Sequence, residues 1–196
     1  LIPRLDELLA SAGLGPSDVD HVYVSVGPGS FTGTRLGVTV ARTLALAAGE
    51  LACVGVGSPA ATAWGARELA WRHLGVVLDA RQGLVWAQLF RRAGGAVGAA
   101  GPGRVRTPAE FLAAAPRPLT LIGEGLGYHD LRAEGVEVPR LDDEALHLPR
   151  PEGVWHVGRA AARAGNFTPP ERLLPVYARR PQAQRLREAQ ERNERP

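Results

Sequence analysis

Residues that carry out catalysis are few in this sequence, and their spacing matches no common catalytic motif. None of the five histidines pairs with another at i and i+4, so the H-E-x-x-H zinc motif of metallopeptidases is absent. No serine lies in a G-x-S-x-G turn, and no local pattern supports a Ser-His-Asp triad. The single cysteine, Cys53, lies in an apolar strand pattern and is typical of a buried thiol. The sequence therefore disfavours a metallopeptidase or a serine hydrolase.

A glycine-rich turn between a predicted strand and a predicted helix is the main candidate for phosphate binding, because free backbone amides point outward at such turns. The strand covers residues 21–26, and the turn runs from Gly27 to Gly33. The Walker motif requires a lysine here, and the sequence contains none. The dinucleotide motif has a shorter glycine spacing and an acidic residue after the next strand, whereas residues 51–56 end without an acid. A structural turn that orients the following helix is therefore favoured over a phosphate site.

The helix predicted after this turn has the pattern of a packing element. Small residues recur at every fourth position and form a ridge that would let another backbone approach closely: Gly33, Gly37, Ala41 and Ala45. An apolar stripe runs beside this ridge and consists of Leu36, Val40 and Leu44. Two buried surfaces are implied, one against a sheet and one against another helix, which could belong to a partner molecule.

Residues 1–12 predict a second amphipathic helix, which Gly13 ends. We predict that the two helices together form a partner interface, whose residues are Leu5, Leu8, Leu9, Phe31, Gly33, Leu36, Gly37, Val40, Ala41, Leu44 and Ala45. Since close helix crossing requires small residues, Gly37→Leu is expected to abolish pairing and to leave the monomer folded.

Four motifs follow one another along nearly the whole chain. Residues 26–37 read V-G-P-G-S-F-T-G-T-R-L-G, and residues 78–87 combine D-A-R-Q-G with V-W-A. Residues 122–125 read I-G-E-G, and residues 175–181 read P-V-Y-A-R-R-P. In sequence and order these motifs resemble those of the TsaB (YeaZ) family in the glycoprotease-like superfamily.

Strands that alternate with helices, with a restart near Gly75, indicate an α/β protein of two lobes. The resemblance implies the actin-like (ASKHA, ribonuclease H-like) fold for each lobe, which periodicity alone does not distinguish from a doubly wound sheet. The expected divisions are a first lobe at 1–74, a second lobe at 75–178 whose final helix can pack back on the first, and a charged tail at 179–196. In this family a β-hairpin precedes the first helix, so the N-terminal strands of the first lobe are expected to be missing from this chain.

Two further expectations concern single segments, one where the first lobe joins the second and one inside the second lobe. A helix is expected from Ser58 to about His73, carrying Trp64 and Trp71 as core residues. Residues 93–103 are rich in glycine and alanine and are expected to form a turn or loop.

The resemblance implies a non-catalytic subunit that supports a TsaD-type threonylcarbamoyltransferase, which forms threonylcarbamoyladenosine next to the tRNA anticodon. The expected partners are a TsaD-like catalytic subunit, a TsaE-like ATPase reached through the complex, a second copy of the chain when the catalytic subunit is absent, and tRNA indirectly. No catalytic, cofactor-binding or metal-binding residue is assigned to this chain, and ATP and metal are expected on the partner subunits.

The alternative is an ATPase or peptidase of the same superfamily that acts on its own. Actin-like ATPases hold magnesium with acidic residues at hairpin turns, and Asp79 occupies such a turn. Asp79 could equally stabilise its own hairpin through backbone hydrogen bonds, which is the interpretation we favour.

The charge of the chain is unevenly distributed. All 23 basic residues are arginine; residues 1–178 contain 17 arginines and 17 acidic residues, so the net charge of +3 comes from residues 179–196. A neutral body argues against nucleic-acid binding by the lobes, whereas RNA binding by the arginine-rich tail is a further alternative. One cysteine and no apolar run long enough to cross a membrane are the pattern of a cytoplasmic protein.

Overall fold

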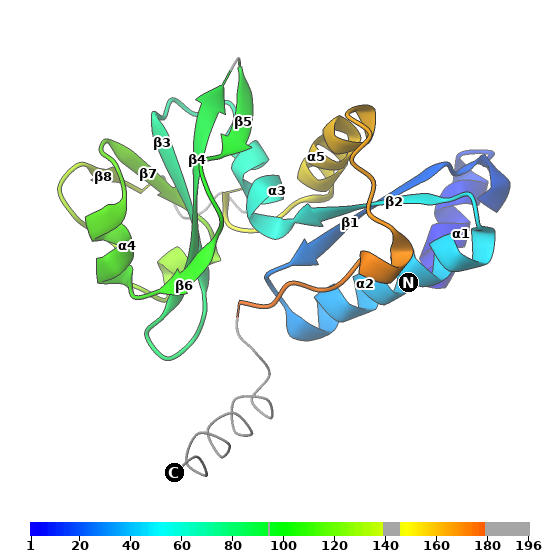
Figure 1. The fold of residues 1–196 in the computed structure, drawn as a ribbon, viewed down its shortest axis with the longest axis horizontal. Helices are drawn as coiled ribbons and strands as arrows, with labels where there is room; N and C mark the ends of the chain where they lie inside the picture. Colours follow the sequence, from blue (N-terminus) through cyan, green and yellow to red (C-terminus); the bar gives the residue numbers. More distant parts are fainter. Residues whose placement is uncertain (94, 139–145, 179–196) are drawn as a thin grey trace, which may run out of the picture.

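The structure is a computed structural model that describes residues 1–93, 95–138 and 146–178. The predicted charged tail at 179–196, with its RNA-binding alternative, lies outside the described residues. Figure 1 shows two lobes, each built around its own β-sheet. None of the described helices is long and apolar enough to span a membrane.

The first lobe is built on two parallel strands that pair from His21 opposite Ala52 to Gly27 opposite Gly57. Its elements up to the second lobe are α1 (Ile2–Ser11), η1 (Pro16–Asp18), β1 (His21–Gly27), α2 (Phe31–Ala48), β2 (Ala52–Gly57) and α3 (Ser58–Gly65). Valines alternate along β1, and those at positions 22, 24 and 26 pack against the α2 side of the sheet. The opposite face of the sheet is covered by α3 and by α5 (Pro151–Arg163).

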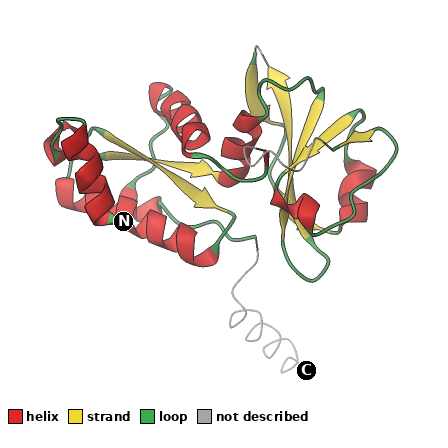
Figure 2. Ribbon diagram, turned by 180° about the vertical axis from the view of Figure 1, so that it is seen from behind, coloured by secondary structure: helices red, strands yellow, loops and turns green. Residues whose placement is uncertain are grey.

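The second lobe contains a mixed sheet with the strand order β5-β4-β3-β7-β8, and β6 also pairs with β4. Its elements are β3 (His73–Asp79), β4 (Val85–Ala93), β5 (Ala96–Ala99), β6 (Arg104–Arg106), α4 (Pro108–Ala114), β7 (Leu119–Ile122), η2 (Glu124–Gly127) and β8 (Val136–Glu137). The predicted hairpin is present, because β3 and β4 are antiparallel, while β7 joins β3 in parallel. Figure 2 shows the strands of this lobe gathered into one twisted sheet.

The chain returns to the first lobe after the second sheet. α5 packs against α3 and against both strands of the first lobe. Beyond it, the Thr168 amide donates to the Cys53 carbonyl oxygen at 2.7 Å, and Leu173, next to η4 (Pro170–Arg172), is buried beside α2. The helix α5 and the segment after it thus pack on the first lobe.

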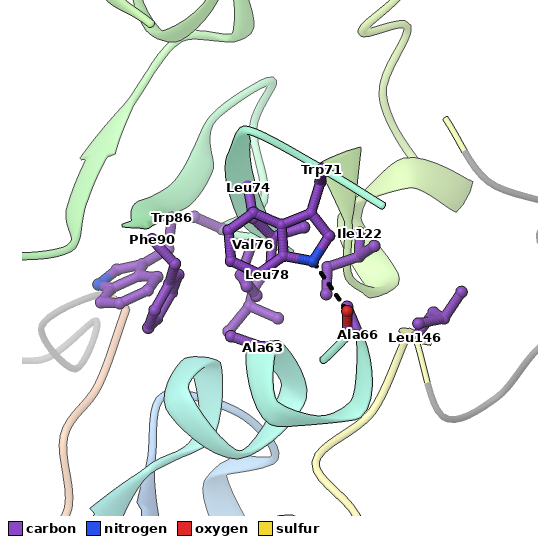
Figure 3. Packing of buried hydrophobic residues seen from close by; sticks show 11 residues of the cluster. Ala63, Ala66, Trp71, Leu74, Val76, Leu78, Trp86, Phe90, Ile122 and Leu146 are labelled. Atoms are coloured by element: carbon purple, nitrogen blue, oxygen red, sulfur yellow. Dashed lines mark hydrogen bonds between the residues drawn. The ribbon is translucent and has the colours of Figure 1, made fainter. Parts of the chain in front are cut away.

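Two local expectations are corrected. The helix that begins at Ser58 ends at Gly65 and not near His73. Trp71 therefore lies outside the helix, where its indole nitrogen donates to the Ala66 carbonyl oxygen at 2.8 Å within the second-lobe core (Figure 3). The predicted loop at 93–103 contains β5, because the edge of β4 supplies hydrogen-bond partners that a short glycine-rich segment could not supply by itself.

Candidate partner interface and interlobe cleft

The long helix α2 begins as its sequence predicts. The Ser30 side chain accepts a hydrogen bond from the Gly33 amide at 3.2 Å, which satisfies one of the free amides of the first turn. Val38, Ala41 and Ala45 then turn toward the β1–β2 sheet and are buried there. The face that α2 buries within its own lobe is therefore fixed by these three residues.

This arrangement corrects part of the predicted interface. Ala41 and Ala45 are only 2% and 3% exposed, because the small-residue ridge brings α2 close to its own sheet. An ideal Cβ on Gly37 would lie 3.6 Å from Cγ2 of Val24, so Gly37 also turns toward β1. Ala41 and Ala45 are thus unavailable to a partner, and Gly37→Leu would disturb the lobe itself rather than test pairing alone.

The apolar stripe beside the ridge remains accessible. Leu36 is 54% exposed, Val40 and Leu44 are half-buried, and Gly33 is exposed. α1 has no buried residue although its pattern is amphipathic; Leu8 is 63% exposed and Leu5 and Leu9 are half-buried. An amphipathic helix of a folded lobe normally buries its apolar side. We name as the α1–α2 face the set Leu5, Leu8, Leu9, Gly33, Leu36, Val40 and Leu44.

Phe31 does not share this face. At 100° per residue it lies about 140° around the helix from Leu36, and its ring instead contacts the Tyr177 ring at a centroid distance of 5.2 Å. The Arg35 guanidinium lies 5.1 Å from the centre of the Phe31 ring on the same side. The Phe31 side chain therefore belongs to the cleft described next, and the predicted partner interface, which included Phe31, is corrected at this residue.

A cleft of about 880 Å³ lies between the lobes. The first lobe contributes Ser25 and Ser58, whose hydroxyl oxygens are 2.8 Å apart, and the second lobe contributes Asp79, Arg81 and Glu124. Within the described residues, no group of three or more histidine, cysteine, aspartate and glutamate side chains could hold a metal ion. The glycine turn lines this cleft through Gly29 and Gly33, among other residues.

Asp79 is the centre of the polar network in the cleft. Its Oδ1 accepts a hydrogen bond from the Arg81 amide at 2.9 Å, which is the hairpin-stabilising bond that the sequence predicts. His129 Nε2 lies 3.0 Å from the same oxygen, and the side chains of Asp79 and His129 are 9% and 8% exposed. The Glu124 carboxylate accepts from the Asp79 amide at 3.2 Å. These contacts join β3, its turn and η2.

The same contacts set the protonation of Asp79. Burial raises the pKa of this carboxyl, but the Arg81 amide, the His129 hydrogen bond and the positive charges of Arg81 and His129 together outweigh burial. The pKa of Asp79 therefore lies below its ordinary value, and the side chain is a carboxylate at neutral pH.

We expect Asp79→Asn to lower the free energy of unfolding by about 1–3 kcal/mol at pH 7, because a charged hydrogen-bond acceptor of a nearly buried pair is lost. Since the folded-state pKa is lowered, the stabilisation is complete above the ordinary aspartate pKa of about 3.9 and is lost as the pH falls through the folded value. Urea unfolding at pH 7 and pH 3 measures this difference.

The exposed Asp130, which pairs with Arg132, gives the matched control Asp130→Asn, for which a small change in the free energy of unfolding is expected. An equal loss for Asp79→Asn at both pH values would contradict the prediction.

Sequence reasoning missed two members of this network. The spacing of the histidines matched no metal-binding motif and singled out none of them, but His129 is nearly buried and is paired with Asp79, 50 residues earlier in the chain. Glu124 lies in the I-G-E-G motif, whose glycines are explained by geometry: a Cβ on Gly123 would stand 2.3 Å from the Val77 carbonyl oxygen. That motif was the available signal for Glu124, and no local pattern identified His129.

Comparison with known proteins agrees with this architecture. The family model described as "TsaD: tRNA N6-adenosine threonylcarbamoyltransferase" matches residues 1–163. The tRNA threonylcarbamoyladenosine biosynthesis protein TsaB of Bacillus subtilis is 28% identical over 93% of this chain and 80% of its own length. TsaB of Escherichia coli is 37% identical over 46% of this chain and 40% of its own length. The solved structure of YeaZ from Pseudomonas aeruginosa matches with a TM-score of 0.75 at 27% identity, covering 90% of this chain and 82% of that chain.

The two sheets and the cleft between them define an α/β protein with an actin-like (ASKHA-type) fold that matches the solved YeaZ structure. A second solved chain, described as similar to the peptidase YEAZ, matches with a TM-score of 0.74. The chain belongs to the TsaD glycoprotease-like family and, within it, to the TsaB/YeaZ proteins of tRNA threonylcarbamoyladenosine biosynthesis.

Proposed function

We propose that this chain is a non-catalytic subunit that supports a TsaD-type transferase through the α1–α2 face. When the transferase is absent, the same face pairs with a second copy of the chain around a two-fold axis. The chain contacts a TsaE-type ATPase and tRNA through the assembled complex, holds no nucleotide or metal by itself, and works in the cytoplasm.

The observation that carries this proposal is the exposure of the α1–α2 face. α1 has an apolar side but no buried residue, and Leu36 of α2 is more than half exposed. Large apolar side chains grouped on one surface are characteristic of protein interfaces. The family also supports the proposal, because the relatives from Bacillus subtilis and Escherichia coli are named TsaB biosynthesis proteins.

Reconstitution tests the supporting role. A TsaD-type transferase and a TsaE-type ATPase are incubated with tRNA, ATP and a preformed activated threonylcarbamoyl donor, with and without this chain. We expect threonylcarbamoyladenosine to appear in the digested tRNA only when the chain is present. Modification at the same rate without the chain would refute the supporting role.

One observation favours the alternative of an independent enzyme. The cleft of about 880 Å³ is large enough for a nucleotide, and Asp79, which pairs with His129, lies at its wall. Titration calorimetry of the purified chain with Mg²⁺ and ATP separates the two functions. The supporting role predicts no measurable heat of binding, whereas micromolar binding with ATP turnover would favour the enzyme.

A further inference from the structure

Five side chains of α3, α5 and the residues after α3 form a continuous stack on the surface of the first lobe. The Arg67 guanidinium lies 3.7 Å from the centre of the Trp64 ring, and Trp64 stacks on His156 at 4.2 Å with an angle of 17° between the rings. His156 meets Trp155 edge-on at 4.6 Å, and the Arg159 guanidinium lies 4.8 Å from the centre of the Trp155 ring. We name this set the aromatic–arginine ladder.

The ladder is accessible and its side chains are held in place. Trp155 remains 45% exposed although His156 and Arg159 flank it. Since an exposed tryptophan normally samples several rotamers, the flanking contacts reduce the entropy that a ligand would have to remove. The ladder therefore holds the exposed Trp155 ring in a preformed position.

The charge beside the ladder is positive. Glu68 is paired with Arg67 at 3.1 Å, and Glu152 is paired with Arg150 at 3.5 Å. Arg159 and Arg163 on α5 form no ion pair with any residue that the structure describes, so two positive charges remain uncompensated there. The neutral total for residues 1–178 therefore conceals a locally basic face.

We propose that the aromatic–arginine ladder binds an unpaired nucleotide of RNA, with the base stacked on Trp155 and the adjacent phosphates near Arg159 and Arg163. Three consecutive aromatic rings with an arginine at each end suit a base and its phosphate better than they suit an apolar protein surface. Trp155 is the large hydrophobic side chain of α5 that is exposed to solvent, so it is the one that a base can reach from this helix. That the RNA is tRNA rests on the proposed function.

The position of the ladder makes this role compatible with partner binding. α2 covers one face of the β1–β2 sheet, whereas α3 and α5 cover the other. Figure 1 shows α3 and α5 together on the side of these strands away from α2. A protein bound to the α1–α2 face would therefore leave Trp155 free, and the two surfaces can be tested by separate variants.

The experiment uses the full chain and a fluorescently labelled tRNA transcript that carries an adenosine next to its anticodon, with affinity measured by anisotropy at about 50 mM salt. Trp155→Ala is expected to raise Kd about tenfold, within the range for loss of one base–aromatic stack. Trp155→Phe should recover most of the affinity. Arg159→Ala should reduce the salt slope of binding by about one, because one phosphate contact is lost. The control Arg104→Ala, on β6 of the second lobe, should change neither quantity.

Three further readouts decide the proposal. Annealing a DNA strand to the anticodon loop pairs its bases and should weaken binding to the level of Trp155→Ala. Tryptophan fluorescence should be quenched by tRNA in the wild-type chain and much less in Trp155→Phe, which a purely structural role would not produce. No binding by the wild-type chain, or equal affinity of wild type and Trp155→Ala, would overturn the proposal.

Binding of the TsaD-type companion is measured in parallel. If Trp155→Ala weakened that binding and left RNA affinity unchanged, the ladder would be a protein interface and the RNA proposal would be wrong. If the companion failed to bind the wild-type chain while RNA affinity still depended on Trp155, the proposed function would fail and the ladder's role would stand.

Discussion

Leu36→Arg is expected to leave the chain folded and to weaken its binding to a TsaD-type companion by about 100-fold or more, because the guanidinium would be desolvated without a partner in an apolar contact. The self-pairing of the chain should be lost as well. Light scattering gives the mass of the chain alone, and titration calorimetry gives the affinity for the companion. Leu36 suits this test since it is 54% exposed and does not belong to the buried cluster between α2 and its sheet.

The matched control is Val105→Arg, which places the same charge on an exposed apolar position of β6 in the second lobe. This variant should keep the wild-type mass and affinity. Leu8→Arg on α1 should reproduce the effect of Leu36→Arg if both helices belong to one surface. A Leu36→Arg variant that still pairs and binds normally would refute the α1–α2 face as the interface.

Gly153→Ala is expected to destabilise the protein by about 2–3 kcal/mol through overpacking. In an exposed helix interior the same change would be stabilising by about 1 kcal/mol, so the expected sign is reversed. The physical reason is contact with a backbone: a Cβ at position 153 would stand 2.4 Å from the Ala61 carbonyl oxygen, and α5 could accept it only by separating from α3.

Urea unfolding followed by circular dichroism measures this change. Gly158→Ala should act in the same direction, since its Cβ would lie 2.6 Å from Cγ of Tyr23 on β1. The control Gly127→Ala adds a Cβ with no neighbour within 4 Å and should alter stability by less than about 0.5 kcal/mol. Unchanged or increased stability of Gly153→Ala would show that α3 and α5 are not packed as closely as described.

Local features of the fold were predictable because neighbouring residues determine them. The Ser30 cap, the β3–β4 hairpin and the Asp79 turn each depend on backbone groups within a few positions along the chain. The ordered motifs also identified the family, which the family model and the curated relatives confirm. The small-residue ridge of α2 was predicted as a packing surface too, but it was assigned to a partner helix, whereas it packs against the sheet of its own lobe.

Tertiary structure alone decided where the faces of each helix point. Periodicity gave α2 a small-residue ridge and an apolar stripe side by side, and only the packing of β1 and β2 shows that Ala41 and Ala45 face inward while Leu36 faces outward. The pairing of Asp79 with His129 and the stacking of Trp64 on His156 likewise join distant parts of the chain. Such contacts depend on the path of the connecting segments and on which surfaces meet, whereas a sequence pattern specifies only the local backbone and the side of an element that is apolar.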